Sequence, residues 1–136
     1  MMDKVKVLIS WSGNNYAATS TEVNGVVIAT GKTLEKVKKE FESAFEFHLQ
    51  GSLADGDDIP KNIQAGNFTF DYELHVSAIL HDLDGVVTRA ALSRVTGINE
   101  KQLGHYLSGF RHPRPEQRKK IISGVHELGH RLITVV

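Results

Sequence analysis

Residues 88–109 read TRAALSRVTGINEKQLGHYLSG, and this segment decides the fold of the C-terminal part of the chain. It predicts two short helices whose apolar positions are Leu92, Val95, Leu103, Tyr106 and Leu107. Gly97 can end the first helix, Ile98 can fill the corner, and Asn99 can cap the second helix. This spacing of small and apolar residues around a glycine is typical of a helix-turn-helix, a DNA-binding motif. An ordinary corner between two helices is the alternative.

The side of the second predicted helix that faces away from its apolar residues is polar. We assign base contacts to this side, and its residues are Lys101, Gln102, His105 and Ser108. At ~100° per residue, Phe110 would continue the apolar side. Arg89 begins the first helix, and Arg111 and Arg114 lie in the stiff, basic segment FRHPRP that follows the second. We expect these three arginines to contact DNA phosphates.

Charge is distributed unevenly along a chain of 136 residues with no net charge. Residues 1–85 hold seven Lys and Arg against thirteen Asp and Glu, whereas residues 86–136 hold nine against three. A basic C-terminal part suits nucleic-acid binding, and an acidic N-terminal part can attract a basic partner. The chain has no cysteine, no signal peptide and no apolar run long enough for a membrane span, which favours a cytoplasmic protein.

Residues 116–136 predict a closing helix with an apolar seam spaced by four and three residues. The seam consists of Ile121, Val125, Leu128, Leu132 and Val135. Such a seam can pack on the two preceding helices, on a second copy of itself, or on both. We assign dimerisation to Ile121, Val125, Leu128 and Leu132, because a two-fold dimer would read two half-sites of an operator. A homodimer or a higher even oligomer is therefore expected.

The N-terminal part predicts a small antiparallel sheet covered by one helix. Apolar and polar residues alternate from Val5 to Trp11, and strands are also expected over residues 16–21, 26–30 and 68–76. Thr33 is the expected cap of a helix that ends at Gln50-Gly51. Residues 51–62 are acidic and rich in turn-forming residues, and we interpret them as a solvated loop. Their aspartates lack the spacing of a calcium-binding EF-hand. A short helix is expected over residues 77–83.

Two segments resemble the HicB antitoxin family. Residues 25–35, GVVIATGKTLE, are similar to that family's strand and Gly-x-Thr-Leu-Glu segment. Residues 91–121, ALSRVTGINEKQLGHYLSGFRHPRPEQRKKI, are similar to the family branch that has a C-terminal helix-turn-helix. The resemblance implies an α+β chain with a partial RNase H-like domain over residues 1–76 and an all-α helix-turn-helix domain over residues 77–136.

The resemblance also implies a function in a type II toxin–antitoxin system. The N-terminal domain would bind and neutralise a basic, HicA-like, mRNA-cleaving toxin, and the C-terminal domain would bind operator DNA and repress the operon. The alternative is a stand-alone helix-turn-helix transcriptional regulator without a toxin partner. RNA binding is a further competitor, but the acidic N-terminal part lacks an evident basic and aromatic platform.

We expect no enzymatic activity, metal or cofactor. Residues 126–130 read HELGH, the His-Glu-x-x-His pattern of zinc proteases, but only six residues follow to supply a third ligand. The stretch from Val5 to Trp11 contains none of the carboxylates that RNase H-like catalysis needs on its first strand. No Gly-x-Ser-x-Gly motif of serine hydrolases is present.

Overall fold

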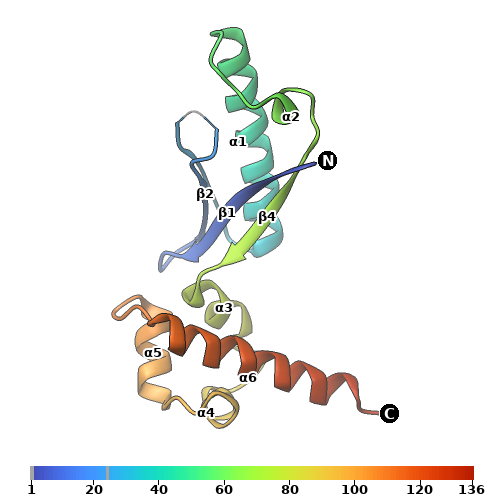
Figure 1. Ribbon diagram of the computed structural model, residues 1–136. Coiled ribbons are helices and arrows are strands. Elements are labelled where there is room, and N and C mark those ends of the chain that lie inside the picture. The colour runs from blue at the N-terminus through green and yellow to red at the C-terminus, as the bar shows by residue number, and fades with distance from the viewer. Residues whose placement is uncertain (1, 24) are drawn as a thin grey trace. The chain divides into compact units, whose positions relative to one another are not determined.

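The computed structural model describes residues 2–23 and 25–136 as a mixed α+β chain (Figure 1). It contains four strands and six helices over these residues. The chain forms two compact units, Met1–His75 and Val76–Val136. All four strands belong to the first unit, and the second unit is entirely helical.

The first unit is a four-stranded sheet with one long helix on one face (Figure 1). The strands are β1 (Asp3–Trp11), β2 (Tyr16–Ser20), β3 (Val27–Gly31) and β4 (Phe68–Leu74), in the spatial order β3-β2-β1-β4. The expected alternation on β1 is confirmed, because Val5, Val7 and Ile9 are buried and the residues between them are exposed.

The expectation of a wholly antiparallel sheet is wrong for β4. β1, β2 and β3 pair antiparallel, but β4 pairs parallel to β1, with Val5 opposite Phe70 and Ile9 opposite Leu74. The cause is the helix α1 (Leu34–Ala54) between β3 and β4. A helical crossover carries the chain from the end of one strand back to the end of the sheet where that strand began. β4 therefore runs in the same direction as β3 and β1.

The segment Gly31-Lys32-Thr33 joins β3 to α1 by a very close approach. A Cβ on Gly31 would lie 2.6 Å from the backbone nitrogen of Val37, so no larger residue fits without a shift of the backbone. Thr33 caps the helix as expected, and its hydroxyl accepts a hydrogen bond of 3.1 Å from the Lys36 amide. α1 then buries Val37, Phe41, Phe45 and Leu49 against the sheet.

Two expectations for residues 50–62 are wrong. α1 continues past Gln50-Gly51 to Ala54, because Ser52 keeps to the buried stripe one turn after Leu49. The segment that follows is a solvated loop only over residues 55–58, because Ile59 is buried and the short helix α2 (Lys61–Gln64) begins at Lys61 and buries Ile63. These two apolar side chains anchor a segment whose composition is otherwise polar.

The second unit consists of α3 (Val76–Leu83), α4 (Arg89–Thr96), α5 (Glu100–Ser108) and α6 (Pro115–Ile133). Val76 begins α3 and does not extend β4, which ends at Leu74. One apolar cluster holds the four helices together, and its buried members are Val76, Leu80, Leu92, Ile98, Leu103, Tyr106 and Ile121.

α6 crosses α4 at a contact that requires glycine. A Cβ on Gly124 would lie 2.8 Å from Cγ2 of Thr96 and 2.9 Å from the carbonyl oxygen of Val95. Gly124 is accordingly buried, although Gly129, one and a half turns later, is exposed and has nothing near it. The close approach of the two helix backbones fixes α6 on the back of the α4–α5 corner.

Candidate nucleic-acid interface

The corner between α4 and α5 is built by hydrogen bonds from neighbouring residues. Gly97 ends α4 with a left-handed backbone (φ 76°), a conformation that costs other residues energy. The side chain of Asn99 caps α5 by accepting a 2.8 Å hydrogen bond from the Gln102 amide. Both features were expected from the sequence, and both are confirmed.

Sequence reasoning missed the part played by Thr96. Its side chain is buried in the corner, where the hydroxyl donates to the Leu92 carbonyl at 2.7 Å and accepts from the Ile98 amide at 3.1 Å. A threonine at the end of a helix gave no particular signal in the sequence. The Thr96 hydroxyl thus provides a hydrogen-bond acceptor for the Ile98 amide, which lies in the turn after the end of α4.

The two sides of α5 differ in burial. Leu103 and Tyr106 lie in the apolar cluster, and Leu107 packs partly buried against it. Of the four residues assigned to base contacts, Lys101, His105 and Ser108 lie on the opposite side, and Gln102 lies on the flank next to Tyr106. Lys101 and Ser108 are exposed, whereas Gln102 and His105 are half-buried.

Hydrogen bonds within α5 already engage two of these four side chains. Nε2 of Gln102 donates to the Tyr106 hydroxyl at 2.9 Å, which holds the amide at the border of the core. The Ser108 hydroxyl donates to the His105 carbonyl at 3.2 Å and accepts from the Phe110 amide at 3.3 Å. Ser108 therefore takes part in ending the helix, and Lys101 is the most open polar group of the four.

Arg89 reaches from the start of α4 to Gly104 on the flank of α5. Its Nη1 lies 3.1 Å from the position that a Cβ on Gly104 would occupy. The absence of a side chain at Gly104 leaves the room that the guanidinium fills. The structure thereby brings Arg89 next to the polar side of α5, a proximity that the sequence does not reveal.

The loop after α5 displays an aromatic ring and positive charge. The expectation that Phe110 continues the apolar side of α5 is wrong, because Gly109 ends the helix with φ 80° and Phe110 is 70% exposed. The Phe110 ring instead lies 4.9 Å from the His105 ring, and the Arg111 guanidinium lies 5.6 Å from the Phe110 ring. Arg114, also exposed, precedes Pro115 at the start of α6.

The seam of α6 divides into a buried and an exposed part. Ile121 belongs to the core of the unit, Val125 packs against that core, and Leu128 is half-buried. Leu132 is 63% exposed, and Val135 lies beyond the helix and is also exposed. The internal core thus uses the first half of the seam and leaves the last two turns of α6 uncovered within the unit.

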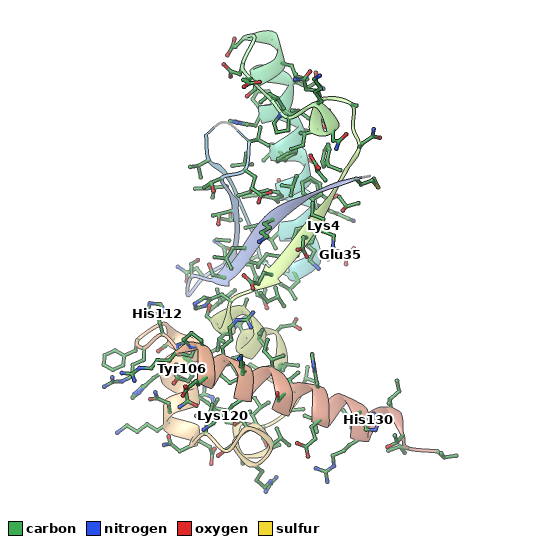
Figure 2. The ribbon with its side chains drawn as sticks, in the orientation of Figure 1. Lys4, Glu35, Tyr106, His112, Lys120 and His130 are labelled. Carbon is green, nitrogen blue, oxygen red and sulfur yellow. The ribbon has the colours of Figure 1, made fainter. Side chains whose placement is uncertain are left out.

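His126 and His130 are both exposed on α6, as is Glu127 between them; Figure 2 labels His130 towards the end of the helix and Lys120 near its start. Among the described residues, no three His, Asp or Glu side chains come together in a group that could hold a metal ion. The two histidines thus have no third ligand beside them within those residues.

Comparisons with known proteins found no match: no family model, no curated protein and no solved structure is significantly similar to the chain. Within residues 2–23 and 25–136, no helix is both long and apolar enough to cross a membrane.

Proposed function

We propose that the α4–α5 corner is a helix-turn-helix and that the second unit binds operator DNA in a sequence-specific manner. The observation that carries the proposal is the corner itself. Capping by Gly97 and Asn99 and burial of Leu103 leave the polar side of α5 exposed. An α-helix presented in this way can enter the major groove, where side chains read the base edges.

The surroundings of α5 support a DNA ligand. Arg89 lies beside the polar side of the helix, and Arg111 and Arg114 lie in the exposed loop after it. Arg118, Lys119 and Lys120 follow on the first turns of α6. Positive charge on both sides of a recognition helix provides the phosphate contacts that fix its register on the duplex.

We further propose that the chain is a HicB-type antitoxin, in which the first unit neutralises a HicA-like toxin ribonuclease. The strand order β3-β2-β1-β4, with α1 between β3 and β4, is compatible with a partial RNase H-like domain and supports this proposal. The first unit is also acidic, with seven Lys and Arg against eleven Asp and Glu over residues 1–75. A basic toxin would be attracted to such a domain.

The DNA-binding proposal is tested by fluorescence anisotropy with the DNA upstream of the chain's own gene and with a scrambled duplex. We expect the full chain to prefer the upstream DNA by ~10³-fold or more at physiological salt. Lys101→Ala should lose most of this preference, and Lys61→Ala is the matched control, because it removes an equal charge from the first unit. Equal affinity of the wild-type chain for both duplexes would contradict the proposal.

The antitoxin proposal predicts a short reading frame for a basic toxin beside the gene, and it is tested by co-expression with that frame. We expect that frame to arrest growth when expressed alone, and the chain to restore growth and to purify with its product. Lys101→Ala should still restore growth, since neutralisation does not depend on DNA. DNA binding without any rescue would favour the alternative, a stand-alone regulator.

A further inference from the structure

β3 forms an open edge of the sheet, and α1 packs against this strand. β3 is an outermost strand in the order β3-β2-β1-β4, so its outer backbone groups pair with no other described strand. A hollow runs beside this edge, between β3 and the second half of α1. Its walls come from Val26, Val27 and Ile28 on one side and from Ala44, Phe47 and His48 on the other. We name this hollow the β3–α1 groove.

The β3–α1 groove is bordered by large apolar side chains in contact with solvent. Phe47 is 83% exposed and Val26 is 58% exposed. Ile28 follows the buried Val27 on β3, so its exposed side chain belongs to the opposite face of the sheet. Phe47 also borders a second shallow hollow on its other side, next to Glu42 and Glu46. Single exposed apolar residues are ordinary on protein surfaces, but here Phe47 and Val26 border one hollow beside an unpaired sheet edge, which makes the hollow a candidate interaction surface.

The charge around the groove indicates what kind of partner fits it. Asp55 and Asp57 line the groove itself, and Glu46 lines the second hollow beside Phe47. Glu42 also lines the second hollow, but its carboxylate accepts a hydrogen bond from Tyr72 on β4, at the other edge of the sheet. Among the described residues that line the two hollows, none is Lys or Arg. An apolar centre with an acidic rim is complementary to a partner that has an apolar anchor surrounded by basic residues.

A second copy of the chain fits this surface less well. A two-fold contact would place the same acidic rim on both sides of the interface, and like charges would face each other there. An open β-edge next to exposed apolar residues is also a liability that proteins normally cover. The occupant with the right chemistry is therefore a different protein with positive charge.

We propose that the β3–α1 groove is the surface on which the first unit binds its basic partner protein, with Phe47 as the central apolar contact. This inference rests on the proposed function, in which that partner is the toxin ribonuclease. It adds the location of the binding surface and the way the partner is recognised. Apolar burial at Phe47 would supply affinity, and the carboxylates at the rim would supply attraction and orientation.

The test uses the full chain and the basic toxin whose reading frame the proposed function predicts beside the gene, with the dissociation constant measured by calorimetry. Phe47→Gln removes the apolar contact and keeps a helix-forming residue, and Glu46→Lys reverses one charge at the rim. We expect each to weaken the complex by roughly tenfold or more. Glu40→Lys is the matched control, because it makes the same charge reversal on α1 at an exposed position that lines neither hollow.

Operator binding serves as a second readout, because all three variants should bind DNA as the wild-type chain does. If Phe47→Gln and Glu46→Lys bind the partner as tightly as Glu40→Lys, the groove is the wrong surface, although the proposed function stands. If the wild-type chain binds no basic partner, the proposed function and the groove fail together. If Phe47→Gln weakens self-association in sedimentation and leaves partner binding unchanged, the occupant is a second copy and the inference is overturned.

Discussion

Replacing Gly124 by alanine should destabilise the helical unit, and the structure gives the magnitude. In an exposed helix interior, alanine is more favourable than glycine by ~1 kcal/mol. The new Cβ of Gly124→Ala would lie 2.8 Å from the Thr96 methyl group and 2.9 Å from the Val95 carbonyl oxygen. The backbone of α4 must then move away from α6, and overpacking of this kind typically costs ~1–3 kcal/mol. Because the obstacle is backbone, we take the upper part of that range and expect a net loss of ~1–2 kcal/mol.

Gly129→Ala is the matched control on the same helix. Nothing lies within 4 Å of the Cβ position at Gly129, so this variant should gain ~0.5–1 kcal/mol from helix propensity alone. The free energies of unfolding are compared by urea titration, with far-ultraviolet circular dichroism as the signal for the helices. The sole tryptophan, Trp11, lies in the first unit, and its fluorescence follows that unit separately. A Gly124→Ala variant as stable as Gly129→Ala would refute the close packing of α6 on α4.

Three further predictions concern DNA binding, assembly and pH. Arg111→Ala should weaken binding to all DNA sequences alike and lower the slope of log affinity against log salt concentration by about one. Lys101→Ala should instead cost ~1–3 kcal/mol of binding free energy on the operator and reduce sequence preference. A salt titration that shows the reverse pattern would contradict our orientation of α5. The exposed second half of the α6 seam predicts a dimer at micromolar concentration. Leu132→Glu should dissociate this dimer without loss of helix content, because it places a charge in the seam. A monomeric wild-type chain in sedimentation would exclude the dimer. Burial and the 2.6 Å hydrogen bond that Tyr72 donates to Glu42 raise the pKa of Tyr72. The stability that follows from this raised pKa is present below pH ~10 and is lost as the pH rises further. Tyr72→Phe should therefore make unfolding of the first unit less sensitive to pH in that alkaline range, and an unchanged pH dependence would disprove this.

The sequence alone predicted those features that depend on residues close together in the chain. The corner at Gly97 and the caps at Thr33 and Asn99 each involve groups two to four residues apart, and the structure confirms all three. The buried stripe of α1 and the alternation of β1 were predictable for the same reason. The period of apolar residues follows directly from the geometry of a helix or a strand.

The direction of β4 and the true extent of α1 were decided only by tertiary structure. The alternation in residues 68–74 indicates a strand but not the neighbour with which it pairs. Its parallel pairing with β1 follows from the crossover of α1, and the last turn of α1 persists because Ser52 is buried. Such outcomes depend on partners far away in the sequence, and a local pattern carries no information on them.

The candidate surfaces show the same division. Local residue types were sufficient to predict which side of α5 would be polar, because helix geometry determines the sides once a glycine and a cap set the ends. The proximity of Arg89 to Gly104, the glycine contact of Gly124 and the exposure of Phe47 beside β3 required the folded chain. Each arises from the distance between two elements, and that distance is set by the packing of side chains from the whole unit.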